Sequence, residues 1–145
     1  MLRKAKCLEI KIATENEIKY CYKMMHQIRE DLSEKALQKM ISEQIKNGYQ
    51  LAYVLHNEQV ICVAGFTIGQ KLSIGKHLYI DDFVTDKSVK STDAGKALLD
   101  FIKIYAKQQE CKSIHLDSSV DRHDAHKFYL SQDLHIASHH FSIDL

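Results

Sequence analysis

Residues 77–119 decide the fold and read HLYIDDFVTDKSVKSTDAGKALLDFIKIYAKQQECKSIHLDSS. The opening run, HLYIDDFVT (77–85), is highly apolar apart from two adjacent aspartates and predicts a strand. A polar turn follows, and apolar residues then recur at helical spacing from about Thr92 to Gln109. CKSIHLDSS (111–119) predicts a second strand. The order strand, helix, strand predicts a β-α-β unit.

The sequence before this unit predicts a strand, then two helices, then a hairpin. Thr14 precedes Glu15 and Glu17, which is the pattern of a helix start with a capping box. Asn57-Glu58 separates two apolar runs and predicts the turn of a hairpin. The elements predicted here are a strand at 7–13, helices at 14–29 and 33–47, and hairpin strands at 49–56 and 59–69.

The end of the chain adds one more helix and one more strand-like segment. DRHDAHKFYLSQ (121–132) predicts a short helix, and HIASHHFSIDL (135–145) is strand-like. The sequence contains no proline, no low-complexity segment and no linker-like change of composition, so residues 1–145 are expected to form a single domain. The order of elements predicts an α/β fold of the mixed α+β kind, with a central, mostly antiparallel mixed sheet flanked by helices on both faces.

The composition is that of a soluble globular protein, with 45% hydrophobic and 27% charged residues among 145. A net charge of +1 predicts neither nucleic acid nor a membrane surface as the main partner. The basic N-terminal residues are not followed by the long apolar run of a signal peptide or membrane anchor. We therefore expect a cytoplasmic protein, and we expect its 4 cysteines, which form no CxxC pair, to be free thiols.

The polar turn before the long helix has the outline of a phosphate site. A helix N-terminus offers unpaired backbone N–H groups to an anion, and Gly95 lets the anion approach closely. Lys87, Lys90 and Lys96 add positive charge. Asp93 opposes binding, because a carboxylate repels a diphosphate. The alternative interpretation is an ordinary helix N-cap made by Ser-Thr-Asp beside solvated lysines.

This turn also resembles the cofactor turn of the GNAT superfamily, the acyl-CoA-dependent N-acyltransferases. That family has the pattern Q/R-x-x-G-x-G/A between a strand and a helix, and KSTDAG (90–95) is similar to it. The resemblance implies a single-domain GNAT-like fold and acetyl-CoA as co-substrate. Two positions depart from the pattern, because Lys90 replaces the usual Arg or Gln and Asp93 replaces the first glycine. The cofactor-binding residues that the resemblance implies are Phe83, Val84, Thr85, Lys90, Ser91, Thr92, Asp93, Ala94, Gly95 and Lys96.

The resemblance further implies two catalytic residues, Tyr129 and Asp82. AHKFYLSQDL (125–134) is similar to the family's A-x-x-x-Y segment, whose tyrosine lies beside the cofactor thiol and acts as an acid or positions the thiol. The family often places an acidic base on the strand before the turn, which here indicates Asp82, acting directly or through water. Asp81 and Asp82 are adjacent and are expected to point to opposite faces of the sheet. The alternatives are a core aromatic for Tyr129, and an amine-binding or solvated edge carboxylate for Asp82.

The histidines near the end of the chain do not predict a metal site. His123 and His126 have a helical spacing that can bind a metal, but no third ligand lies nearby in sequence. A surface helix is the expected structure, with His123 as an alternative acid or base.

Two functions remain open at this stage. The first is an N-acetyltransferase that moves an acetyl group from acetyl-CoA to a primary amine of a small molecule or protein. The second is a GNAT-fold binding or sensor module that has lost turnover, which Asp93 and the missing motif glycine favour. Residues 20–32 form either an acceptor pocket or, as we expect, a core stripe with a charged end. The apolar, strand-like segment 135–145 allows a homodimer.

Overall fold

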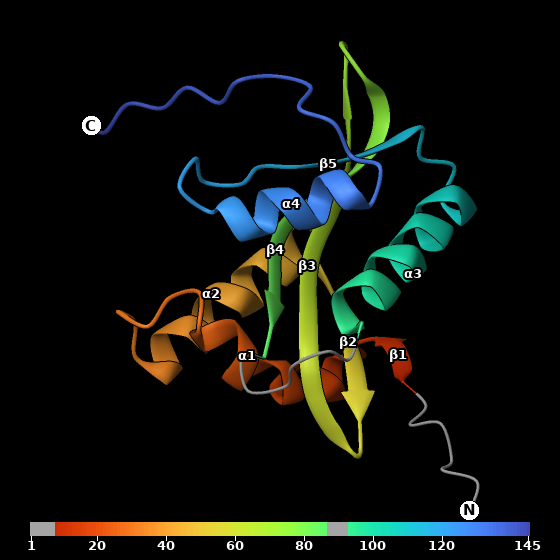
Figure 1. Cartoon of the computed structure of the whole chain (residues 1–145). Coiled ribbons are helices and arrows are strands. Elements are labelled where there is room, and N and C mark those ends of the chain that lie inside the picture. Colours follow the sequence, from red (N-terminus) through yellow and green to blue (C-terminus); the bar gives the residue numbers. More distant parts are fainter. Residues whose placement is uncertain (1–7, 87–92) are drawn as a thin grey trace, which may run out of the picture. The chain divides into compact units, whose positions relative to one another are not determined.

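The computed structural model describes residues 8–86 and 93–145. They form two compact units that divide between His115 and Leu116. The elements, drawn in Figure 1, are β1 (Glu9–Ile12), η1 (Glu15–Cys21), α1 (Tyr22–His26), α2 (Glu34–Lys46), β2 (Gln50–His56), β3 (Gln59–Lys71), β4 (Gly75–Thr85), α3 (Ala94–Gln108), β5 (Ser113–Leu116) and α4 (His123–Ser131).

The strands form a five-stranded sheet in the order β1-β2-β3-β4-β5. Neighbouring strands from β1 to β4 are antiparallel. The turn between β2 and β3 is made by Asn57 and Glu58, both with positive φ (50° and 62°), as a two-residue hairpin turn requires. β4 and β5 are joined through α3, which is how parallel neighbours are connected. The predicted mixed, mostly antiparallel sheet is therefore confirmed.

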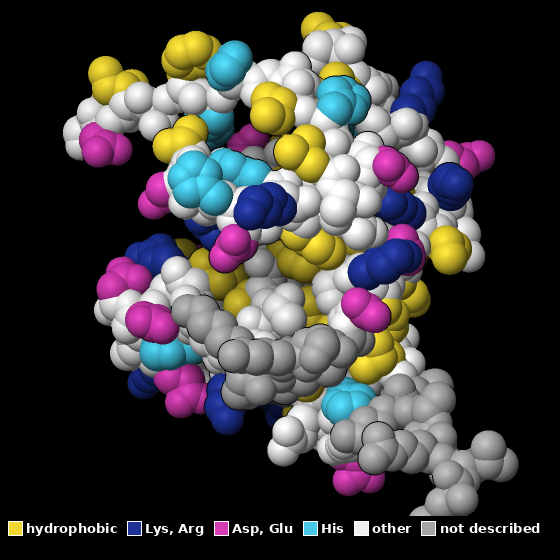
Figure 2. Space-filling model, in the orientation of Figure 1, with side chains coloured by type: hydrophobic (Ala, Val, Ile, Leu, Met, Phe, Trp, Pro, Cys, Tyr) yellow, Lys and Arg dark blue, Asp and Glu magenta, His cyan; other side chains and the backbone are white. Residues whose placement is uncertain are grey.

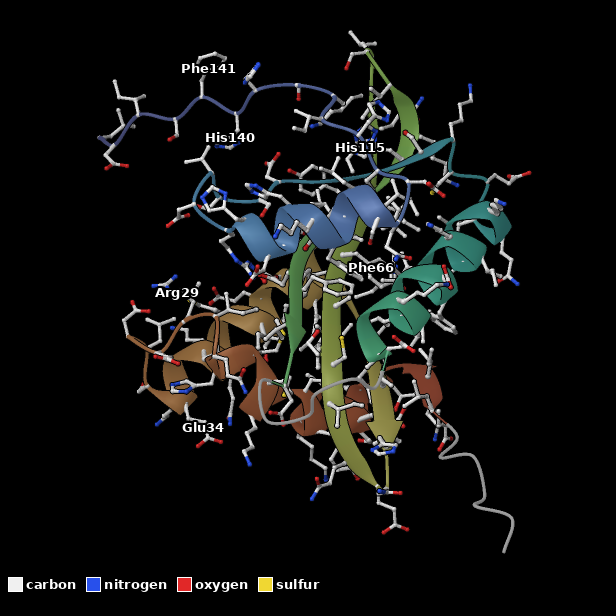
Figure 3. All side chains as sticks on the ribbon, in the orientation of Figure 1. Arg29, Glu34, Phe66, His115, His140 and Phe141 are labelled. Carbon is white, nitrogen blue, oxygen red and sulfur yellow. The ribbon has the colours of Figure 1, made fainter. Side chains whose placement is uncertain are left out.

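Helices cover both faces of this sheet. On one face, Leu51, Tyr53 and Val63 pack in a single buried cluster with residues of η1, α1 and α2. On the other face, the α3 side, the ring of Phe66 meets the ring of Tyr105 from α3 edge-on, with centroids 5.7 Å apart (Figure 3). The predicted arrangement of helices on both faces is confirmed. Side chains alternate along a regular strand, so Leu51 and Tyr53 of β2 share a face with their partners Gly65 and Val63 of β3. A register shift between Val54 and Leu55 interrupts this alternation farther along.

A β-bulge interrupts β4 at its two aspartates. Gly65 of β3 lies opposite Asp82, but the next residue, Phe66, lies opposite Ile80, so Asp81 is an extra residue in β4. A bulge breaks the strict alternation of side chains and re-aims the residues beside it. The sheet is therefore irregular at the position that sequence reasoning singled out.

Two of the predicted elements differ from the structure. The helix expected at 14–29 is a 3-10 helix, η1, followed by the short α1. The segment 135–145, expected to be a strand, belongs to no helix or strand. Its apolar pattern is real, but a strand forms only against a hydrogen-bonded partner. None of the described helices has the length and apolar character needed to cross a membrane.

Candidate active site

Asp82 is held by a buried tyrosine. The hydroxyl of Tyr49, which lies just before β2, donates a hydrogen bond of 2.5 Å to Oδ2 of Asp82. Tyr49 is only 4% exposed and belongs to the cluster under η1, α1 and α2. Asp82 faces the same side of the sheet, because it pairs with Gly65, which in turn pairs with Leu51 of that cluster.

Gly65 makes this contact sterically feasible. A Cβ built on Gly65 would overlap the hydroxyl and Cζ of Tyr49 and would lie 2.7 Å from its Cε2. Real Cβ atoms essentially never come so close to another heavy atom. The Tyr49 ring therefore crosses β3 over a residue without a side chain, which is a common use of glycine inside a strand.

The second carboxylate, Asp81, lies on the same face as Asp82. It accepts a hydrogen bond from the side chain of Thr67, which is two residues from Gly65 along β3 and shares its face. The expectation that Asp81 and Asp82 point to opposite faces is wrong, because the bulge at Asp81 removes the alternation on which it rested. Two adjacent carboxylates thus stand together at the middle of the sheet.

Burial and the neighbouring charge of Asp82 raise the pKa values of Asp81 and Tyr49. Desolvation and the charge of Asp82 raise the pKa of Asp81, while the hydrogen bond from Thr67 works against the rise. Burial, followed by the charge of Asp82 and the hydrogen bond to it, raises the pKa of Tyr49 well above its usual range. Tyr49 is therefore protonated, and able to donate, at every physiological pH. Clusters of perturbed groups of this kind are typical of functional sites.

The last residues of β4 are the predicted contacts of the pantetheine arm. Val84 packs under the helices η1, α1 and α2, and it pairs with Val63. Thr85 pairs with Cys62, whose thiol is 3.5 Å from the Thr85 hydroxyl. Phe83 pairs with Ala64 between them.

β5 lies beside the beginning of β4. The Lys112 N–H donates to the Lys76 carbonyl over 2.8 Å, and the rings of His77 and His115 meet edge-on. β4 then continues to Thr85, which is well beyond these contacts.

The N-terminus of α3 is the predicted pyrophosphate site. Lys90, Ser91 and Thr92 lie outside the described residues. Asp93 precedes the first helical residue and adopts the left-handed conformation, with φ 52° and ψ 21°. The motif position that is glycine in the family is thus a left-handed one here, and Asp is among the few other residues that tolerate this conformation. The backbone conformation of Asp93 therefore explains this departure from the motif without loss of function.

The first turn of α3 keeps the features that an anion site needs. Ala94, Gly95 and Lys96 occupy the first three positions of a 15-residue helix, where backbone N–H groups have no acceptor within the helix. The Lys96 ammonium is paired with Asp100 at 2.7 Å, which holds this side chain along the helix. Its charge therefore acts on an anion at the N-terminus from a distance.

Tyr129 lies on α4, in the second unit. It is partly buried, its ring contacts that of Phe128 with centroids 5.5 Å apart, and its carbonyl accepts the N–H of Leu134. His123 and His126 meet ring to ring on the same helix. Among the described residues, no group of three or more His, Cys, Asp or Glu side chains is placed to hold a metal ion.

The stretch 20–32 contains the expected core stripe with a charged end. Cys21, Met24 and Met25 are buried in the cluster with α2. Its charged end is exposed, and Arg29 donates two hydrogen bonds of 2.9 Å to Asp31 (Figure 3).

A second tyrosine–carboxylate pair lies farther along β2. The Tyr53 hydroxyl donates to Glu17 over 2.6 Å at the wall of a pocket of about 570 Å³, which Tyr20, Lys23 and Asp86 also line. The bonds from Tyr53 and from the Thr14 backbone lower the pKa of Glu17 to about 2. This pair has the chemistry of the Tyr49–Asp82 pair, but its carboxylate lies in η1, between Asn16 and Ile18.

Sequence reasoning missed Tyr49 and Gly65 as site residues. The available signal was the isolated glycine in VICVAGFTIG, because glycine inside a strand indicates a bulge or a close approach. That signal names neither the approaching residue nor its partner, which are distant in sequence.

Comparison with known proteins identifies the class. The family model for the acetyltransferase (GNAT) family matches residues 16–133. The chain therefore belongs to the GNAT family and is an acyltransferase.

Individual relatives agree with this assignment. An uncharacterized N-acetyltransferase of Bacillus subtilis strain 168, YhdJ, is 29% identical over 119 residues, which cover 81% of this chain and 84% of that protein. The fold is that of the aminoglycoside N-acetyltransferase AAC(6')-Iy crystallised with CoA (TM-score 0.87, 9% identity, 100% and 99% of the two chains covered). It is also similar to a ribosomal-protein-alanine N-acetyltransferase from Brucella melitensis biovar Abortus 2308 (TM-score 0.81, 10% identity, 96% and 100% covered).

Proposed function

We propose that this protein transfers the acetyl group of acetyl-CoA to a primary amine. The amine nitrogen attacks the thioester carbonyl carbon, so that a C–N bond forms and the C–S bond breaks. Asp82 takes the proton that the amine loses, directly or through water, and Tyr129 protonates the departing thiolate. The observation that carries the proposal is the presence, in one GNAT-family chain, of carboxylates on β4 and of a helix N-terminus at the start of α3.

The acceptor is a small molecule or a protein. By their names, two proteins of this fold act on an aminoglycoside and on an alanine of a ribosomal protein. An amine that is cationic in water suits the paired carboxylates Asp81 and Asp82, which attract positive charge. We propose that the reaction takes place in the cytoplasm.

The binding step predicts a specific response to substitution of Asp93. In Asp93→Gly, we expect acetyl-CoA to bind several-fold to about tenfold more tightly, because a carboxylate a few ångström from the diphosphate is removed. We also expect a gain in stability of about 1 kcal/mol, because glycine adopts the left-handed conformation without strain. Isothermal calorimetry with acetyl-CoA and urea denaturation measure the two effects.

Asp93→Asn is the matched control, because it removes the charge but keeps a side chain that tolerates the left-handed region. It should gain affinity and little stability. If the wild-type protein binds no acetyl-CoA and releases no thiol with any amine in a broad panel, the function is that of a binding or sensor module instead.

We further propose that the chain forms a homodimer through residues 135–145. The apolar side chains Ile136, Phe141, Ile143 and Leu145 are 79%, 91%, 85% and 118% exposed. Figure 2 shows hydrophobic side chains spaced along this surface, and Figure 3 labels Phe141 on the extended segment. A segment with strand-like alternation and no strand partner of its own suits the edge strand β5 of a second copy, and the same contact is repeated by symmetry.

Removal of residues 135–145 tests this assembly. We expect the full chain to run as a dimer and the shortened chain as a monomer in size-exclusion chromatography with light scattering. The double variant Phe141→Ser, Ile143→Ser should also be monomeric, and it leaves the length of the chain unchanged. A full-length chain that stays monomeric at high micromolar concentration would contradict the proposal.

A further inference from the structure

Two tyrosines on one face of the sheet each donate to a carboxylate. Tyr49 donates to Asp82 over 2.5 Å, and Tyr53 donates to Glu17 over 2.6 Å. Both tyrosines belong to the cluster under η1, α1 and α2. They differ in surroundings, because Asp82 has a second carboxylate, Asp81, beside it on the same face.

The Tyr49 hydroxyl is held in place by packing on both sides. The ring is almost fully buried, and it lies against the backbone of Gly65, where any larger residue would displace it. A buried ring between close neighbours has few alternative rotamers. The direction of the hydrogen bond from the Tyr49 hydroxyl to Asp82 is therefore set by the packing of the Tyr49 ring in the cluster under η1, α1 and α2.

The neighbouring charge makes this bond chemically significant. Desolvation and the charge of Asp82 raise the pKa of Asp81, and the hydrogen bond from Tyr49 is donated to the carboxylate that lies beside it. The Cys21 thiol of η1 also lies near Tyr49, and burial raises its pKa to about 12, so it is neutral and adds no charge.

We propose that Tyr49, seated over Gly65, is a positioning residue that holds the Asp82 side chain oriented to receive the proton of the acceptor amine. This inference rests on the proposed acetyl transfer. It assigns to Tyr49 no contact with the substrate, since the tyrosine acts through Asp82. A proton acceptor must be both correctly oriented and unprotonated before the amine can attack.

Tyr49→Phe tests the assignment, because it keeps the ring and removes only the donor. We expect kcat to fall by about tenfold or more with KM little changed, since the lost contact acts in the chemical step.

Tyr53→Phe is the matched control on the same face of the sheet. It should leave kcat unchanged and affect only the stability of the fold. The folded-state pKa of Glu17 is lowered from 4.5 to about 2, so its contribution to stability is present above pH 4.5 and is lost as the pH falls toward 2. Loss of the Tyr53 donor therefore weakens the fold above pH 4.5 and makes acid unfolding less steep.

A readout without turnover separates this inference from the proposed function. The carbon-13 chemical shift of the Asp82 carboxyl at neutral pH reports its hydrogen bonding, and we expect it to differ between Tyr49→Phe and the wild type. If this chemical shift and kcat are the same in both proteins, the role of Tyr49 is overturned. If the chemical shift differs but the wild-type protein acetylates no amine, the proposed function fails while the contact between Tyr49 and Asp82 stands.

Discussion

Gly65→Ala is expected to lower the free energy of unfolding by about 3–5 kcal/mol, although it adds one methyl group to a regular strand. The added Cβ would overlap the hydroxyl and ring of Tyr49, so the ring has to leave its buried position. The loss then approaches that of deleting a buried aromatic side chain, and Asp82 loses its donor as well. Urea denaturation followed by circular dichroism measures the change.

Gly69→Ala is the matched control within β3. A Cβ there would meet only the ring of His77, at 3.6 Å, which is an ordinary van der Waals distance, so little change in stability is expected. In a Tyr49→Ala background, the cost of Gly65→Ala should largely disappear, because the two substitutions remove the same contact. Additive costs in this double-mutant cycle would show that Tyr49 is not what excludes a side chain at residue 65.

Local pattern was sufficient to predict most of the sheet and the helices. The amphipathic spacing of α3, the serine before α2 and the apolar runs around Asn57-Glu58 each depend on neighbours a few residues away. Ser33 accepts the Ala36 N–H as an N-cap over 3.1 Å, and Glu17 accepts the Thr14 N–H over 3.1 Å as the capping box predicts. Such features are encoded by the segment itself.

The geometry of the candidate site was not encoded locally. The period-two rule placed Asp81 and Asp82 on opposite faces because it assumes a regular strand, and the bulge that unites them is defined only by the register of β3 against β4. The contact between Tyr49, which lies just before β2, and Asp82 of β4 crosses the intervening strand β3. Prediction from local pattern failed for segment 135–145 for the same reason. Its residues alternate as in a strand, but its own sequence does not specify a strand partner.

The backbone conformation of Asp93 changes how its departure from the family motif is interpreted. Read as sequence, an acidic residue in place of a motif glycine argued against cofactor binding. In the structure this residue is left-handed, so the glycine of the pattern is a backbone requirement that aspartate also satisfies. What remains against binding is its charge, which a substitution can remove.

Tyr129→Phe is expected to reduce kcat for acetyl transfer by about 10²–10⁴-fold, the usual contribution of a positioned acid. When the C–S bond breaks, the sulfur leaves as a thiolate unless a proton reaches it during the step. A phenol, with an ordinary pKa of about 10, is protonated at neutral pH and is able to supply that proton. The phenylalanine variant keeps the ring and its contact with Phe128, so the fold of α4 should be preserved. Steady-state assays of thiol release measure the loss.

Three readouts distinguish an acid from a packing residue at this position. The affinity for acetyl-CoA should be unchanged in Tyr129→Phe, because the lost proton transfer belongs to the chemical step. The decline of kcat at high pH, where the phenol ionises, should vanish with the hydroxyl. Tyr105→Phe serves as control, because its hydroxyl donates to Gln50 over 2.9 Å in the core and its loss should cost about 1 kcal/mol of stability without altering kcat. Equal activities in the two variants would assign Tyr129 to packing, and the proton for the thiolate would then have to come from solvent or from another group.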